Sequence, residues 1–177
     1  NFVLKTEAEI RSSNSPSGSV GLISLAKLET KMAGEAVVDA QAYFRDAKSG
    51  ILNGGDLPLQ VGKTTQLTIH WVLKNYYTDI SSAEFSARLP VEMKWTGKVK
   101  TNSTNEPKFD ETTNLVSWKI DRVVATRGVI SDPFEAVFQV EVTPTAGQVG
   151  QILDLLGPTD FVAKDDFADV TINTSDV

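Results

Sequence analysis

Alternation of apolar and polar residues with a period of two is the feature that most limits how this chain can fold. It is strictest over residues 134–142, where every second side chain is apolar and where Pro133 and Pro144 bound the run. Successive side chains of a β-strand point to opposite faces of its sheet, so this pattern predicts a strand with one buried face. Proline lies at the ends of strands rather than inside central ones, which agrees with the assignment.

The same alternation recurs along most of the chain, and no segment predicts an amphipathic helix longer than about two turns. Many short strands separated by loops rich in glycine, proline and asparagine are typical of an all-β sandwich. Residues 20–32 fit both a short helix and a strand, and we interpret them as a strand. Beyond residue 57, strands are predicted over residues 65–73, 83–89, 91–95, 116–120, 134–142, 159–164 and 168–173.

The first predicted strand covers residues 2–11 and is very regular. Lysine, glutamate and arginine fall on one of its faces. The other face carries Phe2, Leu4, Thr6, Ala8 and Ile10. Serine, asparagine, glycine and proline fill residues 12–19, which predicts a flexible loop after the strand.

The chain is longer than its most recognisable sandwich pattern. We predict an N-terminal extension over residues 1–57 and a sandwich domain over residues 58–177. Within the extension, the strand 2–11 and the flexible loop 12–19 precede further strands over 20–45 and a connection over 46–57. A single compact domain over the whole chain is the other arrangement that the sequence leaves open.

Composition excludes several classes of chemistry. The 177 residues include no cysteine and one histidine, which excludes disulfides, thiol catalysis and zinc sites built from cysteine or from several histidines. The formal net charge of −6 argues against binding to nucleic-acid phosphates. No apolar run approaches the roughly 18 residues of a transmembrane helix, so we expect no membrane insertion. We expect no cofactor, no bound metal and no catalytic residue.

The beginning of the sequence suggests a processed protein. It starts at Asn1 rather than at methionine, and no signal peptide is visible. We interpret the chain as a mature secreted protein that has lost its signal peptide, and we expect it outside the cell or on the cell surface. Two Asn-x-Ser/Thr triplets, at Asn102 and Asn173, are candidate glycosylation sites in such a protein.

Two motifs resemble ligand sites. Gly62-Lys63-Thr64 lacks the first glycine of a phosphate-binding loop, because Leu57 stands at that position, and a strand follows it instead of a helix. The second motif is an acidic group whose oxygens suit calcium, although it lacks the glycine of an EF-hand loop. We interpret this group as solvated carboxylates and leave calcium binding open. Its members are Asp160, Asp165, Asp166 and Asp169.

The histidine and the tryptophans are expected to have structural roles. His70 lies on the polar face of its strand, where we expect an exposed side chain rather than the base of a catalytic triad. Trp71 and Trp118 share faces with aliphatic residues and are expected to fill the core. Trp95, which lies near a loop, is expected to do the same.

A series of spaced motifs runs from residue 58 to residue 172. They comprise Pro58, Val61-Gly62, Thr65, Ile69, Trp71, Asn75, Ala87, Leu89-Pro90, Trp95, Gly97, Phe109-Asp110, Thr113-Asn114, Val116, Trp118, Ile120, Pro133, Ala136–Val140, Thr143-Pro144, Gln148–Gly150 and Asp165–Phe167. Together they resemble an immunoglobulin-like repeat domain of the conserved-repeat type, which occurs in surface proteins of small-genome, uncultured bacteria. Asn114 stands where the family usually has glycine, and asparagine tolerates the left-handed turn conformation.

The resemblance implies an immunoglobulin-like β-sandwich of about 7–10 strands with an extended N-terminal strand segment. It also implies a surface-displayed protein that is not an enzyme, and it carries over no catalytic residue. The motifs are structural, so they specify the fold better than the function.

The regular N-terminal strand favours a structural subunit of a pilus-like cell-surface polymer. Phe2, Leu4, Thr6, Ala8 and Ile10 would form a donor strand that adds to a sheet edge of a neighbouring copy. The other interpretation of residues 2–10 is the first strand of the chain's own sandwich.

Two further functions stay open. The first is a stalk, or a ligand- or glycan-binding adhesion domain, in a larger surface protein, with Tyr76 and Tyr77 as a stacking surface. The second is a hydrolase that uses loop carboxylates, although no local motif nominates a pair. The expected partners are therefore copies of the chain or other surface proteins, and the sequence names no small-molecule ligand.

Overall fold

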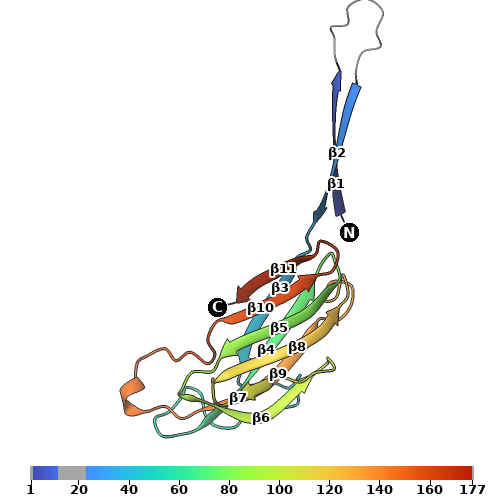
Figure 1. The fold of residues 1–177 in the computed structure, drawn as a ribbon. Helices are drawn as coiled ribbons and strands as arrows, with labels where there is room; N and C mark the ends of the chain where they lie inside the picture. Colours follow the sequence, from blue (N-terminus) through green and yellow to red (C-terminus); the bar gives the residue numbers. More distant parts are fainter. Residues whose placement is uncertain (1, 12–22, 177) are drawn as a thin grey trace, which may run out of the picture.

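A computed structural model describes residues 2–11 and 23–176 (Figure 1). These residues form β-strands and one 3-10 turn, η1 (Ala146–Gln148), which confirms the predicted all-β class. Within these ranges no helix is long and apolar enough to cross a membrane. The strands are β1 (Phe2–Arg11), β2 (Ile23–Met32), β3 (Ala36–Tyr43), β4 (Thr65–Asn75), β5 (Ile80–Arg88), β6 (Met93–Thr101), β7 (Lys108–Asp110), β8 (Leu115–Val123), β9 (Phe134–Val142), β10 (Thr159–Asp165) and β11 (Val170–Asp176).

Strands β3 to β11 form two antiparallel sheets that pack face to face. One sheet has the order β3-β4-β9-β6, and the other has the order β11-β10-β5-β8-β7. If β7 and β8 are set aside and the other strands are lettered A to G along the chain, these orders become A-B-E-D and G-F-C. Those are the two sheets of an immunoglobulin domain. The fold is therefore an immunoglobulin-like β-sandwich with one added hairpin, β7–β8, beside β5.

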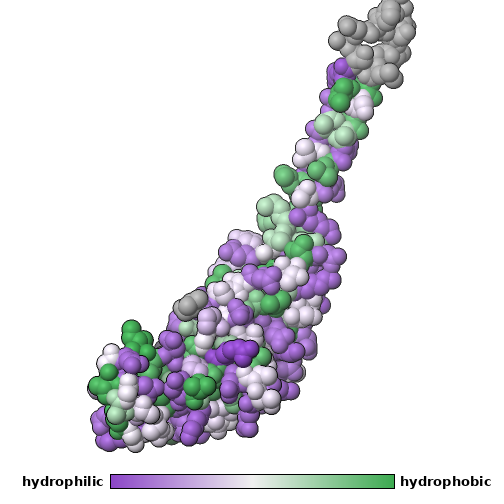
Figure 2. All heavy atoms as spheres, turned by 60° about the vertical axis from the view of Figure 1, so that its left-hand side comes forward, coloured by the Kyte–Doolittle hydropathy of each residue, from purple (hydrophilic) through white to green (hydrophobic). Residues whose placement is uncertain are grey.

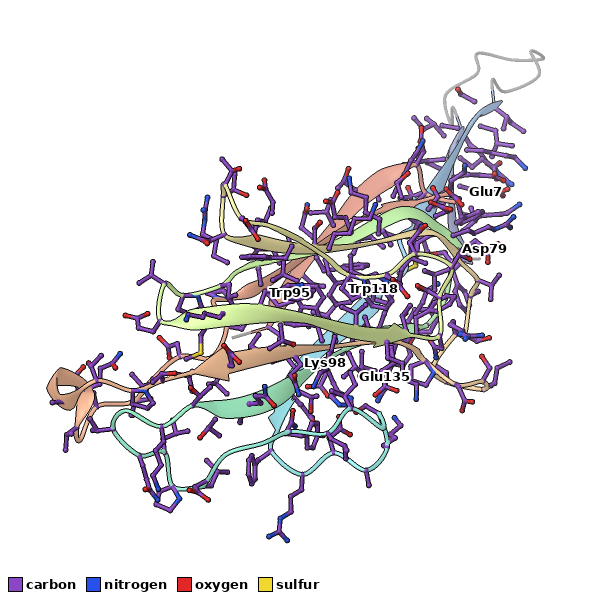
Figure 3. All side chains as sticks on the ribbon, turned by 90° about the horizontal axis from the view of Figure 1, so that it is seen from below. Glu7, Asp79, Trp95, Lys98, Trp118 and Glu135 are labelled. Atoms are coloured by element: carbon purple, nitrogen blue, oxygen red, sulfur yellow. The ribbon has the colours of Figure 1, made fainter. Side chains whose placement is uncertain are left out.

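Aromatic side chains fill the space between the sheets. Trp71 and Trp118 are completely buried, which confirms their predicted role. Phe85 lies between them and stacks on Trp71 with ring centroids 5.5 Å apart. Trp95 is partly buried and stacks on Phe109 at 5.6 Å. Figure 3 shows Trp95 and Trp118 in the interior between the two layers. Edge and stacked aromatic contacts of this kind add to the free energy gained by burying the rings.

The turn between β7 and β8 needs a left-handed residue. Asn114 has φ of +51°, and its carbonyl accepts the N–H of Leu89 at 2.8 Å. Asparagine adopts this conformation more readily than most residues that carry a Cβ. The predicted turn at Asn114 is therefore confirmed.

The first two strands lie outside the sandwich. β1 and β2 pair in register from Phe2 opposite Met32 to Arg11 opposite Ile23. They form a hairpin that projects from one end of the sandwich (Figure 1). The predicted flexible loop over residues 12–19 lies outside the described residues. Because β1 pairs with β2 and not with the sandwich, its interpretation as the first strand of the chain's own sandwich is wrong.

β3 is the strand that follows the hairpin. It falls in the N-terminal extension that the sequence predicts, and it pairs with β4 from Ala36 opposite Asn75 to Tyr43 opposite Thr68. It thereby forms an edge of the four-stranded sheet. The division of the chain between residues 57 and 58 stays a prediction.

Candidate functional site

The β1–β2 hairpin has one apolar face. Directly opposed residues of an antiparallel pair point to the same side, so the register brings Phe2 beside Met32 and Thr6 beside Leu28. None of the residues on this face is charged. Phe2 is 65% exposed and Leu4 is 58% exposed. The members of this apolar face are Phe2, Leu4, Thr6, Ala8, Ile10, Ser24, Ala26, Leu28, Thr30 and Met32.

The opposite face of the hairpin is mostly charged. Lys5 pairs with Glu29 at 2.8 Å, and Lys27 pairs with Glu7 at 2.7 Å, across the two strands. Such exposed ion pairs stabilise a structure by only about 0–1 kcal/mol each. The charged face is suited to water, whereas the apolar face has the composition of a surface that another protein layer covers.

The hairpin also has free backbone edges. Within residues 2–11 and 23–176, β1 pairs with β2 and with no third strand. A two-stranded hairpin on its own is marginally stable in water, and the unpaired edge of a strand accepts a further strand. The hairpin therefore combines an uncovered apolar face with unpaired edges, which are the two requirements for strand addition.

The predicted donor residues all lie on the apolar face. The structure brings them together in a hairpin, not in a single extended strand, because β2 occupies one edge of β1. Both strands are predictable from the sequence, but their pairing is not. The insertion of these residues into a neighbour stays a prediction. The residues concerned are Phe2, Leu4, Thr6, Ala8 and Ile10.

A buried carboxylate attaches the base of the hairpin to the sandwich. Asp165, at the end of β10, accepts hydrogen bonds from Gly34 N at 2.6 Å and from Thr78 Oγ1 at 2.7 Å. The backbone N–H groups of Phe167 and Ala168 donate to its other oxygen, each at 2.8 Å. Burial opposes ionisation of Asp165, but these hydrogen bonds outweigh it and lower the pKa of the carboxyl below 3.8. The linker between hairpin and sandwich is thus held at a defined point.

The linker fits closely against the sandwich. A Cβ atom on Gly34 would lie 2.0 Å from Thr78 Oγ1, so the close approach requires glycine. Lys31, at the end of β2, donates a hydrogen bond to the carbonyl of Phe167 at 2.8 Å. Its ammonium also lies 5.1 Å from the centroid of the Phe167 ring. This attachment cannot be predicted from local sequence patterns, because Gly34 and Asp165 are far apart in the chain.

The acidic group does not assemble into a metal site. Both oxygens of Asp165 accept the hydrogen bonds of the linker and the β10–β11 turn. Asp166 accepts a hydrogen bond from Ser81, and Asp169 pairs with Lys164 at 2.7 Å. In the described part of the chain, no three or more acidic or histidine side chains cluster as metal ligands.

An apolar groove lies at the end of the sandwich opposite the hairpin. It has a volume of about 380 Å³. Its apolar lining comes mainly from the loops that precede β4 and β10. Figure 2 shows hydrophobic residues at this end of the molecule and again along the hairpin. The apolar lining residues include Leu57, Leu59, Val61, Val149, Leu153 and Leu155.

His70 is buried, contrary to the predicted exposure. Its Nε2 lies 2.7 Å from Asp46 Oδ2, and its Nδ1 lies 2.9 Å from Glu135 Oε1. The ring of Tyr43 meets the imidazole edge-on at 4.9 Å. The prediction failed because the connection between β3 and β4, which carries Asp46, covers the outer face of β4. That cover is a tertiary feature which the alternation of one strand does not reveal.

The contacts of His70 fit a structural role and not the role of a catalytic base. Both ring nitrogens face carboxylates, so neither is placed to take a proton from a nucleophile. Burial opposes ionisation of Glu135, but Lys48 at 2.8 Å and His70 together hold the pKa of Glu135 below 4.5. In the same way, hydrogen bonds from Ser49 and His70 outweigh burial and hold the pKa of Asp46 below 3.8. The network fastens the β3–β4 connection to the sheet.

The other predicted surface residues are accessible. Tyr77 is half exposed, and its ring centroid lies 5.9 Å from that of Tyr76. Asn102 is exposed, although its Nδ2 donates to a backbone carbonyl at 2.9 Å and its Oδ1 accepts a backbone N–H at 2.9 Å. Asn173 lies on the exposed side of β11. Glycan binding and glycosylation at these positions stay predictions.

No known protein family matches the sequence, and no curated protein matches it. Several solved structures resemble the chain at low identity. The full-length major pilin SpaD from Corynebacterium diphtheriae is 13% identical with a TM-score of 0.46, over 78% of this chain and 33% of the pilin. BcpA, the major pilin subunit of Bacillus cereus, is 14% identical with a TM-score of 0.43, over 97% of this chain and 53% of the pilin.

A third similar structure is the C-terminal domain of the Streptococcus agalactiae AgI/II polypeptide BspA. It is 11% identical with a TM-score of 0.39, over 88% of this chain and 53% of that one. The chain thus spans between a third and about half of the length of these proteins. Because all three TM-scores are below 0.5, the fold assignment rests on the strand order of the chain itself.

Proposed function

We propose that the chain is a non-catalytic, extracellular structural unit of a cell-surface fibre, joined to the neighbouring unit by strand addition of its N-terminal hairpin. The observation that carries this proposal is the exposed apolar face of β1–β2, which stands clear of the sandwich with its backbone edges unpaired. Phe2, Leu4 and Ile10 would be buried against the neighbour. The charged side of the hairpin would remain in water.

The position of the hairpin favours a linear array. It projects from one pole of an elongated sandwich, so a neighbour that covers it lies beyond that pole (Figure 1). A contact between two different surfaces, repeated from unit to unit without closing, builds a fibre. A pilus-like polymer of identical copies has this geometry, and so does a stalk of successive domains in a larger surface protein. The partner is accordingly a second copy of the chain or another surface protein.

Site-specific photo-cross-linking in cells that carry the gene tests the proposal. A photo-reactive amino acid at position 4 lies on the apolar face, whereas one at position 3 lies on the charged face of the same strand. We expect position 4 to cross-link efficiently to the core of a neighbouring sandwich. Position 3 is the matched control, and we expect at least about tenfold less product from it, because cross-linking follows burial.

Different cross-linking results support and overturn the proposal. A cross-link from position 4 to a sandwich supports strand addition, and the sequence of the linked peptide identifies the neighbour as a copy or as another domain. Equal yields from positions 3 and 4, or no product from either one in assembled surface material, would overturn the proposal.

A further inference from the structure

The first and last hairpins of the chain share a sequence pattern. Phe2-Val3-Leu4-Lys5 at the start of β1 corresponds to Phe161-Val162-Ala163-Lys164 in β10, with three of the four residues identical. In both strands the phenylalanine lies on one face, and the valine and the lysine lie on the other. Each strand is followed by an antiparallel partner, β2 in the first case and β11 in the second.

The outer sides of the two hairpins each carry a lysine in an ion pair. Lys164 pairs with Asp169 at 2.7 Å within its own hairpin, and Lys5 pairs with Glu29 at 2.8 Å within the other. Val162 and Val3 lie on these same outer faces and are both partly exposed. The correspondence therefore includes both faces of the two strands.

The surroundings of β10 show which neighbouring strand and which core contacts cover a hairpin with this pattern. β10 lies between β11 and β5, and Phe161 lies opposite Phe85 in the β5 ladder. The Phe161 ring is completely buried and meets the Phe85 ring edge-on at 5.0 Å. β1 has an equivalent of β11, namely β2, but no equivalent of β5 among the described strands. Phe2 correspondingly lacks the aromatic cover that Phe161 has.

We propose, building on the proposed function, that β1–β2 is the final hairpin of a neighbouring immunoglobulin-like sandwich. It would take the place there that β10–β11 takes in this one. The free edge of β1 would pair with a strand of the β5 kind, and Phe2 would enter an aromatic core. The partner is thus an immunoglobulin-like sandwich that lacks its own last two strands.

An intact second copy of this chain does not offer that place. Its β5 is already paired with its own β10 from Asp160 to Asp165 on one side, and with β8 on the other. The neighbour must therefore be incomplete at the position of its last hairpin. The three residues 33–35 separate β2 from β3, and Asp165 holds this linker, so the completed neighbour and this sandwich would follow one another at a fixed spacing.

A hairpin exchange within the full chain tests the inference. In the exchanged chain, a second copy of residues 2–34 replaces residues 161–177, so the N-terminal hairpin sequence must serve as the last hairpin of this sandwich. We expect a cooperatively unfolding protein with the near-ultraviolet signal of buried Trp71 and Trp118. In the second copy, Leu4→Asp on the inward face should abolish that signal, and the matched Val3→Asp on the outward face should preserve it.

A second measurement covers the case in which the exchanged chain fails to fold. A chain of residues 33–158, which lacks both hairpins, is titrated with a peptide of residues 159–177, and separately with a peptide of residues 2–32. We expect both peptides to restore the tryptophan signal, and Leu4→Asp in the second peptide to weaken its binding at least about tenfold.

The inference is overturned if only the 159–177 peptide restores the signal. It is also overturned if the exchanged chain folds equally well with Leu4→Asp and with Val3→Asp. Neither measurement requires a fibre. A failure here is therefore distinguishable from a failure of the cross-linking test, which concerns assembly on the cell.

Discussion

The first and the last hairpin of the chain have similar sequences and opposite environments. β10 and β1 share the pattern Phe-Val-x-Lys, and both carry the phenylalanine on their apolar face. Yet Phe161 is completely buried and Phe2 is 65% exposed. The difference arises from the neighbour of each strand, since β10 adjoins β5 across a filled core whereas β1 adjoins only β2.

The two hairpins show that the face of a strand which needs cover and the protein layer that covers it are determined separately. Alternation specifies which face of a strand must be covered, because an exposed apolar face is unfavourable in water. It does not specify what covers that face. In β10 the cover is another layer of the same sandwich, and in β1 we propose that it is a neighbouring one.

We expect the largest difference in the free energy of unfolding between alanine variants of the two phenylalanines, Phe161 and Phe2. Phe161→Ala should lower the free energy of unfolding by about 3–5 kcal/mol, because it opens a cavity in the aromatic core. Phe2→Ala in the isolated chain should change it by less than about 0.5 kcal/mol, as for most exposed positions. Urea denaturation followed by tryptophan fluorescence measures both values. Similar losses for the two variants would show that the hairpin is part of the folded core.

A second contrast is between Gly34 in the linker, which has no room for a side chain, and Gly147 in η1, which has room for one. Gly34→Ala should cost about 1–3 kcal/mol, because the added Cβ would lie 2.0 Å from Thr78 Oγ1. Gly147→Ala is the matched control, since a Cβ there meets no atom within 4 Å. Thermal denaturation of both variants checks the prediction. A Gly34 variant as stable as the Gly147 variant would mean that the linker is not held as described.

Acid should weaken the attachment of the linker. The pKa of Asp165 is lowered in the folded chain, so its stabilising contribution is present above the ordinary value of 3.8 and is lost as the pH falls below it. Asp165→Asn should cost about 2 kcal/mol at pH 7, and this cost should shrink at pH 3. The exposed Asp132→Asn serves as control. Unfolding curves at several pH values measure the difference, and a pH-independent cost would refute the role of the charge.

The smallest effect is expected from removing the hairpin altogether. Deletion of residues 2–32 leaves the linker and the whole sandwich, and it removes the hydrogen bond and the cation–π contact of Lys31 with Phe167 at the boundary. The melting temperature of the sandwich should change by no more than about 4 °C, which corresponds to about 1 kcal/mol for a chain of this size. Circular dichroism against temperature tests this. A large loss of stability would mean that β1 and β2 support their own sandwich.

Local patterns predicted most of the sandwich. Alternation identified β4, β5, β9 and β10, and the tryptophans at positions 71 and 118 were correctly placed in the core. Asn114 was recognised as a turn residue because its conformational preference is local. These features depend on residues that are close in the sequence.

Features that depend on distant residues could not be predicted. His70 was expected to be exposed, since nothing near it in the sequence shows that the β3–β4 connection covers it. Asp165 was grouped with its acidic neighbours, although its function is to hold Gly34, which lies 131 positions away. The candidate donor residues were found from alternation alone, but their pairing with β2 required the structure.

Hydrogen–deuterium exchange tests the central claim most directly. The backbone amides of β1 and β2 should exchange rapidly in the isolated chain, because an uncovered two-stranded hairpin opens easily. In surface fibres isolated from the cells, the same amides should exchange as slowly as those of β10 and β11. Equally rapid exchange of β1 and β2 in both samples would contradict the claim that a neighbouring sandwich covers the hairpin.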